Sequence, residues 1–408
     1  MTKDLKISRR KFAAAALLNL GTVAWFFLLI IYMPDIFAAI TLNDPFWGHY
    51  NIGQILFIGF TIFCSVTASF IGERISRRRL LVFSVFLGTF STILMALLQG
   101  TIFAAVLGSL AGTSLGLGLL GGVALVADYT VVEERARVSG IVILGTFIAA
   151  FATIAVIQIL NFGILSTILL FAVVRSTSFL ALIIDKCDRP VPIVKERPHL
   201  PTTVYREFFF YLFPWVMFSI ASSLASNLIP KTEYATEYII GSMLRYVFIA
   251  VFGLVSGVVA DRFGRKWPII IGLIVLGVGF NLLGFNFTGT SVIIYLAISG
   301  VTWGSFFVTF LAIPGDLSVL GSREKFYALG YILPLAIMFS FVAIPGPDLS
   351  SFLSASSFAQ ILSVFLYVPI VPVLRAKETL QESKIQERKM KEYAERAGKI
   401  VQESKEDK

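Results

Sequence analysis

The chain has 408 residues, of which 57% are hydrophobic and only 14% are charged, and its formal net charge is +9. Soluble domains are about 45–50% apolar and about 25% charged, so this composition excludes an ordinary soluble enzyme and a disordered chain. The excess of Lys and Arg fits nucleic-acid binding, but membrane proteins also concentrate these residues on their cytoplasmic side. The two cysteines, Cys64 and Cys187, imply no disulfide framework.

Twelve segments are apolar over about 20 residues, the length that a helix needs to cross the hydrocarbon core of a bilayer. They are 12–33, 49–71, 80–98, 101–126, 139–160, 163–184, 208–229, 237–259, 268–285, 290–313, 327–345 and 352–374. The short polar links between them suit antiparallel neighbours. The pattern predicts an all-α integral membrane protein with twelve transmembrane helices.

The basic residues sort to one side of these segments. If the N-terminus is cytoplasmic, all but three of the 34 Lys and Arg residues fall in cytoplasmic segments. The exceptions are Lys231 in an outer loop and Arg175 and Arg245 within spans. The bias predicts a multi-pass plasma-membrane protein with both termini in the cytoplasm. The positive charge therefore needs no nucleic-acid partner.

The two halves of the sequence repeat each other. An ungapped shift of 188 residues superposes acidic, basic and small residues in one constant register. The residue pairs related by this shift include Glu73 and Asp261, Arg77 and Arg265, Gly112 and Gly300, Asp128 and Asp316, and Arg135 and Arg323. Transporters are often built from such repeats.

The repeat divides the chain into four parts. Residues 1–184 and 207–374 are predicted to form two pseudo-symmetric six-helix bundles. The segment 185–206 contains four prolines among mixed charges and is typical of a cytoplasmic linker. The tail 375–408 is highly charged, with apolar residues near helical spacing, which fits a solvated helix or a helix on the membrane surface.

One segment resembles a known family. Gly257–Lys266 reads Gly-Val-Val-Ala-Asp-Arg-Phe-Gly-Arg-Lys, which is similar to the signature loop of the major facilitator superfamily. The first-half copy is degraded and keeps Glu73, Arg74 and Arg77. The resemblance implies two bundles around a central cavity, lined by helices 1, 4, 7 and 10, with transport by rocking of one bundle against the other.

The resemblance also implies a cytoplasmic latch that favours the outward-open state. Its members would be Asp261, Arg262, Gly264, Arg265 and Lys266 in the second half, Glu73, Arg74 and Arg77 in the first half, and Asp128, Arg135, Asp316 and Arg323 in the following loops. A carboxylate at a helix end can cap the exposed amides of another helix. The alternative is that these charges only set the topology.

Several side chains are candidates for substrate contact. They are Asn19, Trp25, Trp215, Ser219, Ser223, Thr302 and Trp303. The serines share one face of helix 7, which either lines a wet cavity or packs on a neighbour. The tryptophans could stack on a sugar or clamp an apolar solute, or they could fill the core.

Charges inside the bilayer are more informative, because each costs about 2.5–3.5 kcal/mol on insertion scales. Arg245 is eight residues into its predicted span, roughly 12 Å from the outer end. It either binds an anion or pairs across helices, and Asp35 and Glu237 are candidate partners and candidate coupling residues. Arg175 is expected to snorkel inward.

Together these features predict a secondary or facilitative transporter of a small organic solute, with an organic anion favoured and protons as a candidate coupling ion. A carrier of sugars or neutral metabolites and a non-transporting membrane sensor remain alternatives. The sequence has no nucleotide-binding loop and no cluster with metal-ligand spacing, so we expect no enzyme activity, cofactor or metal. The expected partners are the solute and the lipid bilayer, and the expected state is a monomer.

Overall fold

The computed structural model describes residues 5–42, 51–71, 75–187, 201–225, 228–229, 233–318, 323–332, 334, 336–337 and 354–380. Eleven helices in this part of the chain are long and apolar enough to cross a membrane. They match eleven of the twelve predicted spans. Most of the remaining span, 327–345, lies outside the described residues.

The helices of the first half are α1 (Arg9–Asn19), the π-helical η1 (Leu20–Ala24), α2 (Trp25–Ile40), α3 (Ile52–Ile71), α4 (Arg77–Leu97), α5 (Thr101–Tyr129), α6 (Arg135–Ile159) and α7 (Ile164–Ile184). Those of the second half are α8 (Thr202–Ala225), α9 (Ala235–Phe263), α10 (Lys266–Phe285), α11 (Gly289–Leu317), α12 (Arg323–Tyr327), the π-helical η2 (Ala328–Ile332), α14 (Ala355–Tyr367) and α15 (Ile370–Arg375). The elements α1, η1 and α2 form one continuous span. The predicted all-α membrane fold is confirmed.

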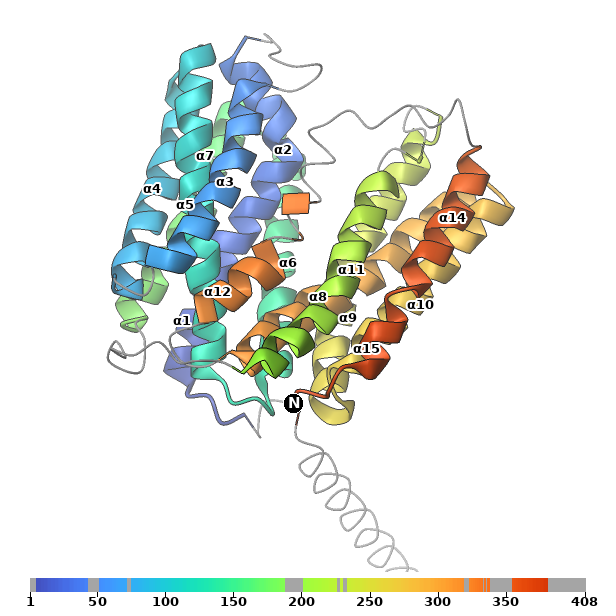
Figure 1. Cartoon of the computed structure of the whole chain (residues 1–408). Coiled ribbons are helices and arrows are strands. Elements are labelled where there is room, and N and C mark those ends of the chain that lie inside the picture. Colours follow the sequence, from blue (N-terminus) through green and yellow to red (C-terminus); the bar gives the residue numbers. More distant parts are fainter. Residues whose placement is uncertain are drawn as a thin grey trace, which may run out of the picture.

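The two halves form two bundles. Figure 1 shows α1 to α7 on one side and α8 to α11, α14 and α15 on the other, with the bundles close together at the bottom and diverging towards the top. Both α1 and α15, which lead to the two termini, lie at the bottom. We call this end the charged end and the other the opposite end. The short helix α12 contacts α5 and α3 of the first half.

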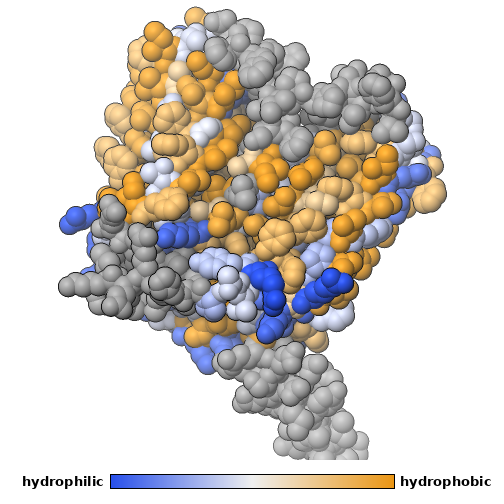
Figure 2. Space-filling view, viewed as in Figure 1, coloured by the Kyte–Doolittle hydropathy of each residue, from blue (hydrophilic) through white to orange (hydrophobic). Residues whose placement is uncertain are grey.

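The outer surface of the bundles is apolar. Figure 2 shows hydrophobic residues over most of this face, while hydrophilic residues gather near the charged end. Phe86, Ile183 and Phe285, for example, are 58%, 77% and 81% exposed. Such side chains suit lipid as a solvent, and the helices satisfy their own backbone hydrogen bonds there.

Glycines hold equivalent helices together in the two halves. A Cβ atom added to Gly112 of α5 would lie 2.3 Å from the carbonyl oxygen of Phe57 in α3. A Cβ atom added to Gly300 of α11 would lie 2.3 Å from the carbonyl oxygen of Arg245 in α9. Both residues of the second contact are 188 positions after those of the first. The sequence repeat is therefore also a repeat of backbone contacts.

A hydrogen bond repeats in the same register. The Ser114 hydroxyl of α5 donates to the carbonyl oxygen of Ser84 in α4 at 2.7 Å. The Thr302 hydroxyl of α11 donates to the carbonyl oxygen of Gly272 in α10 at 2.8 Å. Thr302 is fully buried, so its hydroxyl serves the packing of two helices.

Arg175 points inward, into the interior of the first bundle, where it is 0% exposed. Its guanidinium donates to the hydroxyls of Thr22 at 2.7 Å, Ser84 at 2.8 Å and Ser114 at 3.2 Å. It also lies 5.0 Å from the ring of Trp25. Neutral hydroxyls and an aromatic face thus replace water around this cation.

Candidate functional site

Ion pairs cross between the bundles at the charged end. The guanidinium of Arg77, at the start of α4, donates to the Glu324 carboxylate of α12 at 2.7 Å and also pairs with Asp128 at the end of α5. Asp128 in turn pairs with Arg323 of α12. Arg77 is 3% exposed. Two acids and two arginines from both halves therefore form one buried group.

A second group of ion pairs is built in the same way, but here the acid comes from the second half and its arginine partner from the first. Arg135, the first residue of α6, pairs with Asp316 near the end of α11. Arg265 pairs with Asp316 at 2.9 Å and with Asp261 at 2.6 Å, and it donates to the backbone oxygen of Val132 in the first half at 2.6 Å. Burial by itself lowers the pKa of Arg265, but the carboxylates of Asp316 and Asp261 outweigh it and raise the pKa above its ordinary value.

Asp261 also caps a helix of the other bundle. Its carboxylate accepts hydrogen bonds from the backbone N–H groups of Ala136 at 3.2 Å and Arg137 at 2.8 Å, in the first turn of α6. The Arg137 side chain adds an ion pair at 3.3 Å. These amides have no partner within their own helix, so a negative charge is favourable there.

The two groups are related by the 188-residue shift. Asp128 of the first half binds Arg323 of the second, and Asp316 of the second half binds Arg135 of the first. We call the whole set the charged cluster, and it consists of Arg77, Asp128, Arg135, Arg137, Asp261, Arg265, Asp316, Arg323 and Glu324. The structure thus brings together most of the residues predicted for the latch.

Other predicted latch residues lie elsewhere. Glu73 and Arg74 are outside the described residues. Arg262 is exposed at the end of α9, and the Lys266 side chain donates to the carbonyl oxygen of Leu374 at 3.3 Å. Gly264 has a φ of 106°, a backbone conformation that favours glycine.

Aromatic side chains form a layer nearer the middle of the helices. Trp215 is fully buried and stacks on Phe310 at 5.1 Å, whereas Trp303 is half-buried and lies 5.1 Å from Phe307. Phe307 approaches Phe147 of the first half at 6.5 Å. These five aromatic side chains, which we call the aromatic layer, therefore join the two bundles.

Trp25 and Asn19, which were also predicted to contact the substrate, are instead packed against neighbouring helices. The indole N–H of Trp25 donates to the Thr92 hydroxyl at 3.0 Å inside the first bundle. The amide of Asn19 donates to the carbonyl oxygens of Ala15 at 2.8 Å and Gly122 at 3.2 Å. The burial of Trp25 and Asn19 favours a role in the core over contact with a solute.

The serines of α8, which is the seventh predicted span, form hydrogen bonds within their own helix. The hydroxyl of Ser219 donates to the carbonyl oxygen of Trp215, and that of Ser223 to the carbonyl oxygen of Ser219, both at 2.8 Å. Both serines are buried. Back-bonding of this kind satisfies a hydroxyl within its own helix, so packing on a neighbour is the favoured alternative for this polar face.

Arg245 is half-buried beside the aromatic layer. Its guanidinium lies 5.4 Å from the ring of Tyr246, and that ring contacts Phe27 of the first half at 4.9 Å. In the described part of the chain, Arg245 pairs with no carboxylate. The side chain of Glu237 lies instead against Gly289, at the start of α11. The charge of Arg245 is thus not neutralised by the residues that the sequence proposed as its partners.

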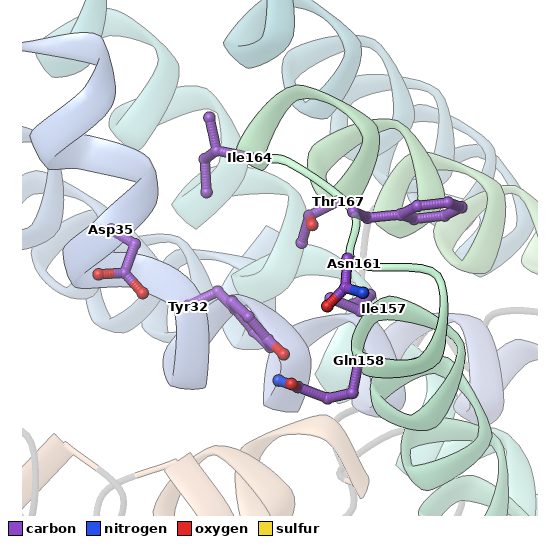
Figure 3. A pocket seen from close by; sticks show the side chains of 8 residues that line it. Tyr32, Asp35, Ile157, Gln158, Asn161, Ile164 and Thr167 are labelled. Carbon is purple, nitrogen blue, oxygen red and sulfur yellow. The ribbon is translucent and has the colours of Figure 1, made fainter.

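Asp35 lies in a pocket at the opposite end, between α2, α6 and α7. Figure 3 shows Asp35 at one edge of this pocket next to Tyr32, with Gln158, Asn161 and Thr167 on the far side of Tyr32. The cavity measures about 330 Å³. The sequence singled out Asp35 but did not predict the residues around it.

No family model matches the chain, and no curated protein matches its sequence. Solved structures do match its shape. A major facilitator superfamily transporter, FucP, in the outward conformation has a TM-score of 0.71 at 13% identity, over 90% of this chain and 100% of the other. The chain has the fold of the major facilitator superfamily.

Two further structures support the same fold. The human organic anion transporter MFSD10 (TETRAN) has a TM-score of 0.63 at 15% identity, over 90% of this chain and 99% of the other. A single-site variant of the fucose:proton symporter FucP of E. coli has a TM-score of 0.65 at 11% identity, over 90% of this chain and 98% of the other.

The sequence did not predict that the segment after α15, which contains Glu378 and Thr379, is hydrogen-bonded to the rest of the protein. The Glu378 carboxylate accepts from the backbone N–H groups of Arg265 at 2.8 Å and Lys266 at 3.4 Å, at the start of α10. The Thr379 hydroxyl donates to Asp316 at 3.1 Å. The start of the tail is therefore bonded to the charged cluster.

Glu207 and Tyr211 of α8 fix the backbone of the same segment. The N–H of Lys377 donates to the Glu207 carboxylate at 2.6 Å, and its carbonyl oxygen accepts from the Tyr211 hydroxyl at 2.8 Å. A tyrosine and an acid near the start of α8 were the only sequence signals for this anchor.

Proposed function

We propose that this protein is a secondary transporter that moves a small organic solute by alternating access, and that the charged cluster is the latch of its inner gate. The observation that carries this proposal is the reciprocal pairing of Asp128 with Arg323 and Asp316 with Arg135 across the two bundles. A rocking motion that opens the charged end must break these pairs together. The cluster therefore forms a two-state element of the kind that alternating access needs.

The proposed orientation places the charged end in the cytoplasm of a plasma-membrane protein. The positive-inside bias of the sequence supports this, since the basic segments and the start of the tail share that end. The described conformation, closed at the charged end, then corresponds to an outward-facing state.

For the solute we favour an organic anion, recognised by Arg245. Its half-buried guanidinium has no carboxylate partner in the described residues, so an anion could neutralise it. One structure of similar fold is an organic anion transporter. The alternative is a sugar or neutral metabolite bound on the half-buried Trp303, since another structure of similar fold is a fucose:proton symporter.

Proton coupling is a further part of the proposal. Asp35 and Glu237 are carboxylates at the opposite end, one in each half, and either could take up a proton from the outside. Uptake with and without an imposed pH gradient separates a symporter from a facilitative carrier.

Counterflow in liposomes tests transport itself, because a sensor that only binds its ligand gives none. Vesicles loaded with a mixture of organic anions and sugars are assayed for exchange of each labelled compound. We expect Arg245→Gln to raise KM for an anionic solute at least tenfold and to leave exchange of a neutral one unchanged. Unchanged anion exchange by this variant would remove the anion argument.

Spin labels test the latch separately. Leu160 and Phe285 are exposed at the opposite end, one in each half, and Arg79 and Phe263 are exposed at the charged end. We expect Arg135→Gln to lengthen the charged-end distance and shorten the opposite-end distance, because breaking a buried pair costs about 3–5 kcal/mol. The exposed Arg262→Gln is the control. A lengthening at both ends would contradict alternating access.

A further inference from the structure

The pocket around Asp35 is built by three elements of the first half. Asp35 and Tyr32 come from α2, Gln158 from the last turn of α6 and Thr167 from the first turn of α7. Asn161 lies in the tight turn between α6 and α7, with a φ of 48°. Figure 3 shows Gln158, Asn161 and Thr167 close together on one side of Tyr32 and Asp35 on the other.

Most of the polar groups around this space are not used by the protein. The Thr167 hydroxyl donates to the carbonyl oxygen of Gly163 at 3.1 Å. In contrast, within the described chain the side chains of Asp35, Gln158 and Asn161 make no hydrogen bond or ion pair. Asp35 at one edge of the pocket and the amides of Gln158 and Asn161 at the other therefore remain available to a ligand.

The charge of the pocket is negative. Asp35 is the only acidic side chain in its lining, and no Lys or Arg lines it. The helices α2 and α6 both end near this level, so their negative dipole ends add to the effect, while the start of α7 offsets part of it. An anion is therefore disfavoured in this pocket, in contrast to the site proposed at Arg245.

The remaining lining is apolar and aromatic. Ile157, Phe162 and Ile164 complete the wall, and the ring of Tyr32 is held by an edge contact with Phe171 at 5.5 Å. A carboxylate beside aromatic rings suits an organic ammonium, because the ring faces and the carboxylate both attract the cation. The cavity of about 330 Å³ is at the lower end of the range for small-ligand sites.

We propose that this pocket is a binding site for a small arylalkyl ammonium compound, distinct from the solute site at Arg245. The ammonium pairs with Asp35 next to Tyr32, and the apolar body extends along the Tyr32 ring towards Phe162. A bound ligand would connect α2 with the turn between α6 and α7. The proposal does not depend on which solute the protein transports.

Calorimetry on the full chain in nanodiscs tests this, with three probes that share one frame: phenethylamine, 2-phenylethanol and phenylacetate. We expect phenethylamine to bind at least tenfold more tightly than either of the others. Asp35→Asn should weaken phenethylamine at least tenfold, whereas Asn161→Ala, which changes a polar group away from the ammonium, should leave its affinity nearly unchanged. The control Glu237→Gln changes an acid at the same end but outside the pocket, and Arg245→Gln changes the proposed anion site, so neither should alter this affinity.

Asp35 and Asn161 are exposed, so these variants should keep the thermal midpoint of the parent, which is measured alongside. Equal binding of phenethylamine and 2-phenylethanol, or binding that survives Asp35→Asn, would overturn the proposal. So would the absence of phenethylamine binding at about 10 mM. Loss of transport in Arg245→Gln would leave the result at Asp35 untouched, so the two ideas fail separately.

Discussion

At the scale of single residues, the protein solvates its interior charges in two ways. Arg175 is surrounded by hydroxyls and an aromatic ring, whereas Arg265 is held by two carboxylates. The first arrangement suits a permanent charge in a rigid bundle. The second suits a contact that must form and break, because released carboxylates and guanidinium groups can be hydrated when the gate opens.

Replacing Arg175 with Lys should destabilise the protein although the charge is kept. The compact ammonium cannot reach the hydroxyls on three helices that the planar guanidinium bridges. We expect a loss of about 1–3 kcal/mol from the unmet hydroxyl and cation hydrogen bonds. Thermal unfolding measures it, with the exposed Arg262→Lys as the control. Equal thermal midpoints for the two variants would show that the hydroxyl groups around Arg175 do not contribute to stability.

The thiol of Cys187 should react slowly at neutral pH. Burial, and to a smaller extent the charge of Asp185, raises its pKa to about 11. Since only the thiolate attacks, the rate of alkylation should rise about tenfold per pH unit between pH 7 and pH 10. Mass spectrometry of iodoacetamide-treated protein gives the rate. A rate that levels off near pH 8.5 would indicate an ordinary, solvent-exposed thiol.

At the scale of elements, paired helices of the two halves share one design. The pairs α3–α5 and α9–α11 approach closely because glycines face a carbonyl of the neighbouring helix. Small residues at such contacts allow the close packing that drives helix association in lipid. The sequence predicted this packing for Gly112 and Gly300, but not which carbonyl each would meet.

Gly300→Ala should therefore lower stability, since the new methyl group would lie 2.3 Å from a backbone oxygen that cannot move alone. We expect a loss of about 1–3 kcal/mol from overpacking. Gly145→Ala is the matched control, because a Cβ atom there meets nothing within 4 Å. It should be neutral or stabilising by about 0.5–1 kcal/mol, as alanine favours a helix. Circular dichroism during heating compares the two.

The segment after α15 makes a second prediction at this scale. Glu378→Gln keeps the shape of the side chain but removes the charge that caps the start of α10. A capping interaction contributes about 0.5–2 kcal/mol, and its loss frees the backbone of Arg265, whose side chain binds Val132 of the first half, so the charged end should open more often. Spin labels on Arg79 and Phe263 measure this as a larger fraction of long distances. The exposed Glu233→Gln, at the opposite end, should leave the distribution unchanged.

At the scale of the whole molecule, the sequence predicted the fold because lipid imposes simple rules on it. Helix length, the side that carries the basic residues and the 188-residue repeat are all local or periodic properties. Eleven described spans agree with the predicted ranges to within a few residues, apart from the longer first span. The resemblance to the major facilitator superfamily rested on the signature-like loop together with the repeat, the span count and the middle linker, and the whole fold agrees with it.

The site was less predictable, because it depends on contacts between distant parts of the chain. Glu324 and Glu378 join the cluster only because α12 and the start of the tail pack at the charged end. Trp25 and Trp215 are as apolar as Trp303, and only the packing shows that they are buried more deeply. The unused polar groups around Asp35 likewise come from three separate elements.

The composition of the charged cluster has an electrical consequence. With Glu378 included, the described contacts join five arginines to five carboxylates. The first half contributes an excess of two positive charges and the second an excess of two negative charges, so the halves attract while the whole remains neutral. A membrane voltage acts on each charge that moves across the membrane, at about 2.3 kcal/mol per charge per 100 mV. Because the two excesses are equal and opposite, their contributions offset each other when the halves move alike, so we expect the cluster to add little to any voltage dependence of transport.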